Sequence, residues 1–250
     1  SPAGVAFDGS GLLINPGAMN DDILAIASSG NDNFLIVSEG FRGSAPRALA
    51  NVVAYGVLPT PSAADPHALQ NWRVDSSLSA TNDLFAVAAG VGRYVVGGSV
   101  GFTASSSNFV DWKTNLPVAN RVEEIIYRPG LFVGVGLGQV FQSTNGMAWQ
   151  VQGAPNLAGI TYGNGRYVAV GTAGTYFTST NLTNWTVEFM GTNATFMGVA
   201  HGNDKFVAVG GGGAIRISTN GLNWTAGISA TNRPTSLRAV TYAQGQFVAV

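Results

Sequence analysis

A unit of about 40 residues recurs along this chain, and it limits the fold more than any other feature. The three closest copies, at residues 157–171, 196–210 and 237–250, each contain two short apolar runs around a Gly/Asn turn. This pattern predicts a tight antiparallel hairpin. Weaker copies lie at residues 23–40, 84–97 and 122–136.

A polar turn and a tryptophan follow most of these hairpins. Two such turns read Ser143-Thr-Asn-Gly-Met-Ala-Trp149 and Ser218-Thr-Asn-Gly-Leu-Asn-Trp224. Short polar side chains bond to the nearby backbone and glycine accepts a positive φ, so we expect a further strand on each side of the turn. The residues assigned to this structural repeat are Trp72, Trp112, Trp149, Trp185, Trp224, Ser143, Asn145, Gly146, Ser218, Asn220 and Gly221.

Four strands in about 40 residues predict an all-β fold, with each unit forming one blade of a β-propeller. One blade cannot bury both of its faces, and a regularly placed tryptophan suits the space between two blades. At these turns the chain resembles the Asp-box, or BNR-like, propeller repeats of bacteria, whose turn reads Ser-x-Asp-x-Gly-x-x-Trp. Here Asn replaces Asp, and one residue fewer separates Ser from Trp. The resemblance implies a sialidase-like or photosystem-assembly-factor-like architecture and says little about chemistry, because the motif of that family is structural.

The last repeat stops at Val250, after two of its four strands. Joining the chain head to tail places Gly4 at the position of Gly101, Gly174 and Gly213, so we expect residues 1–20 to supply the missing outer strands. This predicts one domain of six blades, approximately at 21–78, 79–118, 119–153, 154–191, 192–232 and 233–250 plus 1–20. Two alternatives are a longer protein with seven or more blades and a blade completed by another chain, giving a polymer.

Departures from the repeat are where a particular function would be encoded. The innermost strand is expected to carry small residues near the axis, and Glu123, Glu124 and Arg238 depart from that pattern. His201 stands where other repeats have tyrosine. If these four residues face one end of the axis, they form a polar pocket of mixed charge. Solvated strand ends with a single ion pair are the alternative.

A second departure is an insertion of about 20 residues in the first blade, within residues 40–69. Binding residues concentrate on loops that a rigid scaffold positions. Arg42, Arg47, Tyr55 and His67 lie in or beside this insertion, and we take them as candidates for contact with a partner.

Composition excludes several classes of function. The 12 Lys+Arg residues against 13 Asp+Glu give a net charge of −1, which provides no electrostatic footprint for nucleic acid. The sequence contains no cysteine, and its two histidines and isolated acids lack the spacing of a metal site. We therefore expect no cofactor and no metal. Without an apolar run of about 18 residues, no transmembrane segment is expected.

The sequence thus predicts a non-catalytic, secreted or cell-surface bacterial propeller that binds a protein or polysaccharide, or assembles with copies of itself. A sialidase-like glycoside hydrolase is the alternative. Glu123 and Glu124 are a poor catalytic pair, because neighbouring residues of a strand point to opposite faces.

Overall fold

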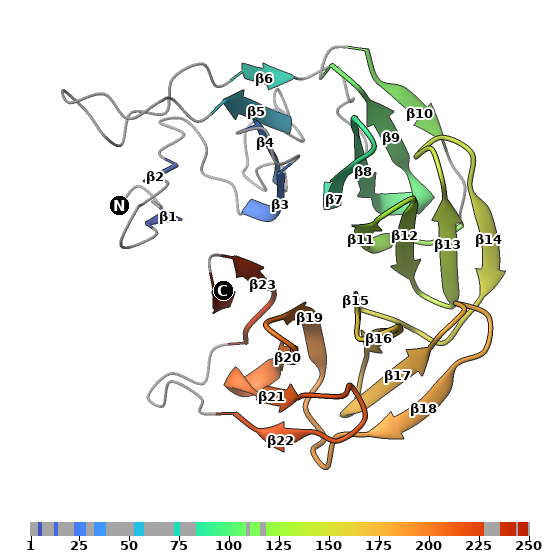
Figure 1. Ribbon diagram of the computed structural model, residues 1–250. Helices are drawn as coiled ribbons and strands as arrows, with labels where there is room; N and C mark the ends of the chain where they lie inside the picture. The colour runs from blue at the N-terminus through green and yellow to red at the C-terminus, as the bar shows by residue number, and fades with distance from the viewer. Residues whose placement is uncertain are drawn as a thin grey trace, which may run out of the picture.

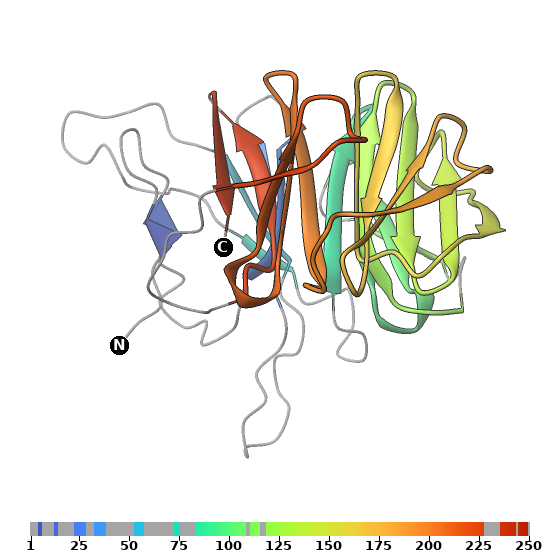
Figure 2. The same cartoon turned by 90° about the horizontal axis from the view of Figure 1, so that it is seen from below.

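The fold is known here from a computed structural model, which describes residues 84–108, 111–115, 119–227, 236–243 and 245–249. Before residue 84 it describes only six strand segments, at 5–6, 13–14, 23–28, 33–38, 53–57 and 73–75. Its sheets are arranged radially around a central axis, with the strands lying roughly along that axis (Figures 1 and 2). The predicted all-β propeller is therefore confirmed.

Each complete blade is an antiparallel meander of four strands that pair in chain order. The alternating and continuous apolar runs of the sequence form the inner strands, and the Ser/Asn turns connect the third strand to the fourth. The blades are β3–β6 (Ile23–Ser28, Asn33–Ser38, Val53–Val57, Arg73–Asp75), β7–β10 (Leu84–Gly90, Arg93–Gly98, Thr103–Ser106, Lys113–Asn115), β11–β14 (Val122–Arg128, Leu131–Gly136, Gln139–Ser143, Gln150–Gly153), β15–β18 (Gly159–Gly163, Arg166–Val170, Thr175–Ser179, Thr186–Phe189) and β19–β22 (Phe196–Gly202, Lys205–Gly210, Ile215–Ser218, Thr225–Ala226).

The expected count of six blades is corrected by the structure, which describes four blades in full, β7–β22. A fifth four-stranded sheet, β3–β6, is described by its strand positions alone. Among the described residues, no strand pairing joins the two halves of the expected sixth, composite sheet. Its two halves are separate two-stranded sheets, β1 with β2 (Val5–Ala6, Leu13–Ile14) and β23 with β24 (Val240–Ala243, Gln246–Ala249).

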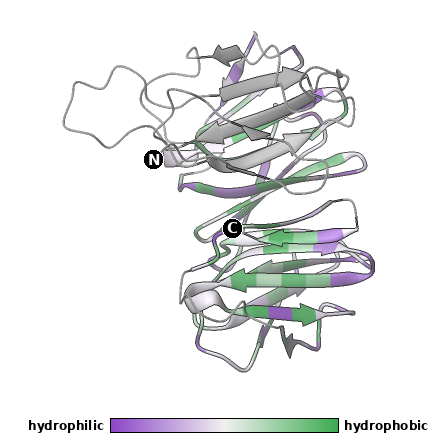
Figure 3. Ribbon diagram, turned by 90° about the vertical axis from the view of Figure 1, so that its left-hand side faces the viewer, coloured by the Kyte–Doolittle hydropathy of each residue, from purple (hydrophilic) through white to green (hydrophobic). Residues whose placement is uncertain are grey.

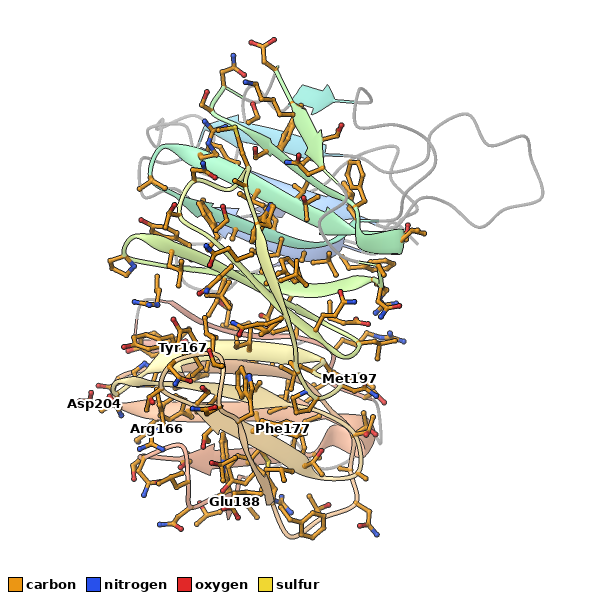
Figure 4. All side chains as sticks on the ribbon, turned by 90° about the vertical axis from the view of Figure 1, so that its right-hand side faces the viewer. Arg166, Tyr167, Phe177, Glu188, Met197 and Asp204 are labelled. Atoms are coloured by element: carbon orange, nitrogen blue, oxygen red, sulfur yellow. The ribbon has the colours of Figure 1, made fainter. Side chains whose placement is uncertain are left out.

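The first strand of each blade lies nearest the axis, and successive first strands are neighbours in the order β3, β7, β11, β15, β19 and β23 (Figure 1). We call the face where these inner strands begin the start face, and the face where their hairpins turn the turn face. Met197, near the beginning of β19, and Asp204, in its hairpin, lie on opposite sides of the wheel (Figure 4).

Apolar residues from adjacent blades form a series of interblade cores. One core joins Val95 of the β7–β10 blade to Phe132 and Phe141 of the next. The following cores join β11–β14 to β15–β18 and then β15–β18 to β19–β22. The second strands are buried along nearly their whole length, and the strands near the C-terminus are apolar over most of their length (Figure 3). Since each blade buries two faces, the fold depends on stacking around the ring.

In the part of the chain that the structure describes, no helix is long and apolar enough to span a membrane.

Candidate functional site

The repeated turns are held by a fixed set of hydrogen bonds. Ser143 Oγ accepts from the Gly146 N–H at 2.8 Å, and its hydroxyl donates to Asn145 Oδ1 at 3.0 Å. Asn145 Oδ1 also accepts from the N–H groups of Met147 and Ala148, both at 2.9 Å. The same contacts recur at Ser179 with Asn181 and at Ser218 with Asn220. An amide oxygen thus accepts the bonds that a carboxylate could accept there.

The described tryptophans lie beside the interblade cores rather than on an open platform. Trp149 meets Phe141 edge to face at 5.1 Å, and Trp224 meets Tyr176 at 5.6 Å. Trp185 packs on the next core and donates its indole N–H to the Leu182 carbonyl at 2.9 Å. Trp112 packs on the core of the β7–β10 blade. Trp72 lies outside the described residues.

The start-face rim of the axis is shaped by β-bulges. The register of the inner hairpin shifts at Leu24, Phe85, Glu123 and Met197, which occupy one position of the repeat. A bulge adds one residue to a strand and redirects its side chain. At Glu123 this produces an ion pair with Arg121 at 2.5 Å, and the Arg121 guanidinium also lies 4.0 Å from the centre of the Phe85 ring.

Glu124 occupies the position that Ala86, Gly159, Gly198 and Ala239 hold in other blades. Its Oε2 accepts the Ile160 N–H of the neighbouring inner strand at 2.6 Å. A Cβ atom on Gly159 would come within 3.1 Å of the same oxygen, so the small residue there makes room for the carboxyl group. Burial raises the pKa of Glu124 to about 8, and the bond from Ile160 only partly opposes this shift.

The turn-face rim is built from aromatic rings that lie on glycines of the preceding blade. A Cβ atom added to Gly90 would lie 2.2 Å from Tyr127 Cγ, and one on Gly202 would lie 2.0 Å from Tyr242 Cγ. Each ring also packs, tilted, on the aromatic residue opposite it in its own hairpin. Only glycine lets the two inner strands approach this closely without displacing the ring.

His201 is a member of this set of rings. It packs against Phe206 with ring centres 4.5 Å apart, and a Cβ atom on Gly163 would lie 2.2 Å from its Cγ. Burial lowers the pKa of His201, with Asp204 acting in the opposite direction. Its Nε2 is buried without a hydrogen-bond partner among the described residues. His201 lies near the end of β19, on the turn face. Met197, which is equivalent to Glu123, lies near the beginning of the same strand, on the start face.

Arg128 is the exception on the turn-face rim, because it replaces the glycine found at positions 90, 163 and 202. Its guanidinium carbon lies 5.1 Å from the ring centre of Tyr162 and 5.5 Å from that of Tyr167. Its Nε donates to the Tyr167 hydroxyl. Arg128 is not among the candidate residues predicted from the sequence, although aligning the repeats at this position distinguishes it from Gly90, Gly163 and Gly202.

The structure therefore groups the candidates differently from the single polar pocket considered above. Glu123 and Glu124 lie on the start face, and so does Arg238, which is exposed two residues before β23. Among the described residues, the one ion pair is that of Arg121 with Glu123, so Arg238 pairs with neither glutamate. His201 lies near the turn face. Tyr55 falls in β5, whose side chains are not described, while Arg42, Arg47 and His67 lie outside the described residues.

Comparisons with known proteins agree on the fold. No family model matches the sequence, and no curated protein matches it. Among solved structures, one of YCF48 bound to a D1 peptide is similar over 100% of this chain and 78% of the other, with 13% identity and a TM-score of 0.66. A chain in a structure of U3-55K is similar over 89% of this chain and 72% of the other, with 7% identity and a TM-score of 0.67.

A chain in a nidogen/laminin complex is similar over 94% of this chain and 89% of the other, with 9% identity and a TM-score of 0.65. At such low identity the similarity shows the fold alone. What these comparisons establish is that the chain has the fold of a β-propeller.

Proposed function

We propose that this chain is a non-catalytic binding module that holds a protein or peptide segment at a rim of its axis. The observation that carries the proposal is the location of the departures from the repeat. Arg121, Glu123 and Glu124 gather at the start-face rim, and Arg128 and His201 lie at the turn-face rim. Residues shared by the blades build the scaffold, so charged exceptions at its axis are suited to recognition.

Two of the similar structures support this proposal by analogy. One is of YCF48 with a D1 peptide, and another is of a nidogen/laminin complex. A propeller of this size can therefore serve as a platform for a peptide or a protein, and we propose that use here.

The proposal is tested by panning a library of displayed random peptides against the full chain and measuring the affinity of enriched peptides by fluorescence anisotropy. We expect Glu124→Gln or Arg128→Gln to weaken at least one enriched peptide. The matched control, Val187→Thr on the exposed outer strand β18, should leave it unchanged. Affinities that respond only to the outer-strand variant, or a library that yields no binder, would overturn the proposal.

A glycoside hydrolase is the second candidate, and Glu124 is the observation that favours it. A carboxyl group with a raised pKa is what a general acid requires. The adjacent Glu123, however, is held in its ion pair with Arg121. Release of a fluorescent product from a panel of aryl glycosides, abolished by Glu124→Gln, would favour the hydrolase over the binding module.

We further propose that the ring is completed as a sixth blade by the two terminal hairpins, and that the repeats are related to Asp-box propellers. When the chain is joined head to tail, Val5 and Ala6 of β1 align with Thr175 and Tyr176 of β17, which supports an outer-strand role for β1. Location at a bacterial cell surface, polysaccharide binding and self-association belong to the same proposal and rest on composition and resemblance.

A further inference from the structure

We propose that the turn-face rim binds a carboxylate of the partner, and that Arg128 is the residue that recognises it. This inference rests on the proposed binding function and adds the chemistry of the bound group. The site consists of Arg128 at the end of β11 and of Tyr162 and Tyr167 from the neighbouring blade. No other described blade has a charged residue at the position of Arg128.

The Arg128 guanidinium is half-buried and has no anionic partner among the described residues. The single ion pair found there belongs to Arg121 and Glu123, on the other face. Arginine keeps its charge at any physiological pH, so this position cannot avoid the cost of burial by losing a proton. Contact with two tyrosine rings offsets part of that cost, and an anion would offset more of it.

The hydrogen bond to Tyr167 holds the Arg128 guanidinium in one orientation, which suits contact with an anion. Nε is engaged by the Tyr167 hydroxyl, and Tyr167 itself is buried, with 1% of its surface exposed. The N–H groups on Nη1 and Nη2 have no hydrogen-bond partner in the described part of the chain. Two parallel donors held in one orientation match the two oxygens of a carboxylate.

Tyr162 adds an apolar contact beside the charge. Its side chain is 36% exposed and lies tilted on Tyr167, with ring centres 4.7 Å apart. The other described charges on this face include Arg93, Arg166 and Lys205, at the starts of second strands, and Asp204 beside His201. Asp111 and Lys113 lie in and just after the Ser/Asn turn of the β7–β10 blade. The cations exceed the acids there, which also favours an anionic group over a cationic one.

Small probes of matched shape test the inference on the full chain. The probes are N-acetyl-phenylalanine with a free carboxylate, its uncharged amide, and the α-amide of N-acetyl-glutamic acid, whose carboxylate is in the side chain. Binding is followed by NMR from the Arg128 Nε–H and tyrosine ring signals. Because only the carboxylate can accept two charge-assisted hydrogen bonds from the guanidinium, we expect it to bind at least about tenfold more tightly than the amide. The two acids show whether a terminal or a side-chain carboxylate is preferred.

Three variants separate recognition from stability. Arg128→Gln should remove the preference for the acid over the amide. Tyr167→Phe keeps the charge but releases Nε, so it should weaken acid binding by a smaller factor. Arg93→Gln and Arg166→Gln remove cations of the same face and should leave the preference intact.

The inference is overturned if acid and amide bind equally, if no probe binds, or if Arg128→Gln, folded by its NMR spectrum, keeps the preference. None of these results decides the proposed function, because the peptide-panning experiment tests that function separately.

Discussion

At the scale of single residues, one contact between blades is made in two alternative ways. In the first way, an arginine side chain packs against the glycine of a Ser/Asn turn in the next blade. A Cβ atom added to Gly146 would lie 3.1 Å from Arg93 Cδ, and one added to Gly221 would lie 3.2 Å from Arg166 Cδ. In the second way, at the interface between the β11–β14 and β15–β18 blades, Leu131 replaces the arginine and Leu182 replaces the glycine. Both leucines belong to one apolar core. Leu182 holds a φ of 66°, close to the 68° of Gly146. Burial of its side chain offsets the cost of that left-handed conformation.

Leu182→Gly should therefore destabilise the protein by about 1–3 kcal/mol, since the loss of a buried leucine exceeds the relief of backbone strain. Adding Leu131→Arg should recover part of this loss by reproducing the Arg/Gly contact of the other interfaces. Urea denaturation of both single variants and the double variant measures the coupling. Strictly additive changes would contradict the compensation.

The Ser/Asn turns give a second prediction for single residues. Asn145→Ala removes the acceptor of two backbone N–H groups and should cost about 1–2 kcal/mol of unfolding free energy. Asn145→Asp retains an oxygen acceptor and should stay close to the wild type at neutral pH. Chemical denaturation distinguishes the two. A loss in Asn145→Asp as large as that in Asn145→Ala would show that the acceptor is not what stabilises the turn.

Glu124 predicts how stability depends on pH. Its pKa is about 8 in the folded protein, above that of an unfolded carboxyl group, so the folded state binds the proton more tightly. The stabilising contribution is complete below the unfolded pKa, near 4, and is lost as the pH rises to about 8. We expect the melting temperature to fall between pH 5 and pH 9.

Glu124→Gln should flatten this profile and melt above the wild type at pH 9. Glu123→Gln is the matched control, because it removes a neighbouring carboxylate and should keep most of the slope. An unchanged slope in Glu124→Gln would refute this assignment of the titrating group.

At the scale of elements, inner strands can approach one another only where glycine faces a ring. A Cβ on Gly163 would come within 2.2 Å of His201 Cγ, so Gly163→Ala must displace that ring or separate β15 from β19. We expect a loss of about 1–3 kcal/mol, typical of overpacking. Gly153→Ala is the control, because a Cβ there meets no atom within 4 Å. Thermal melts that rank the two variants equally would contradict the close approach.

The same elements show how far the sequence could predict this protein. Hairpins and Ser/Asn turns followed from a local pattern, because alternation and turn chemistry act over a few residues. The bulge at Glu123 lies within its own hairpin, but alternation alone does not mark it. The reach of Glu124 to Ile160 could not follow from the local pattern, since it depends on a neighbouring strand 36 residues away. Arg128 lies between these cases, because its exceptional position is visible in the repeat but its contact with Tyr162 is not.

At the scale of the whole molecule, the interblade cores link the described blades into one continuous stack. Such a stack is stable only if its two ends are covered. The β23–β24 hairpin already has the inner features of a blade, since Tyr242 packs on Gly202 and on Phe247. Among the described residues no outer pair of strands is bonded to it, and β1, whose residues align head to tail with those of β17, belongs to the hairpin that we propose for this place.

An introduced cysteine pair tests this closure, because the chain contains no cysteine of its own. In β16–β17, Ala169 pairs with Phe177, and the head-to-tail alignment of the repeats places Ala249 and Phe7 at those positions, Phe7 lying outside the described residues. With Ala249→Cys and Phe7→Cys, a short thiol-reactive cross-linker should join the two positions within one molecule, as detected by peptide mass mapping. The control pair, Ala249→Cys with Ser107→Cys on a distant blade, should not react. Cross-links formed only between molecules would show instead that the terminal strands complete a blade in a second copy, and the absence of any cross-link would rule out a shared sixth blade.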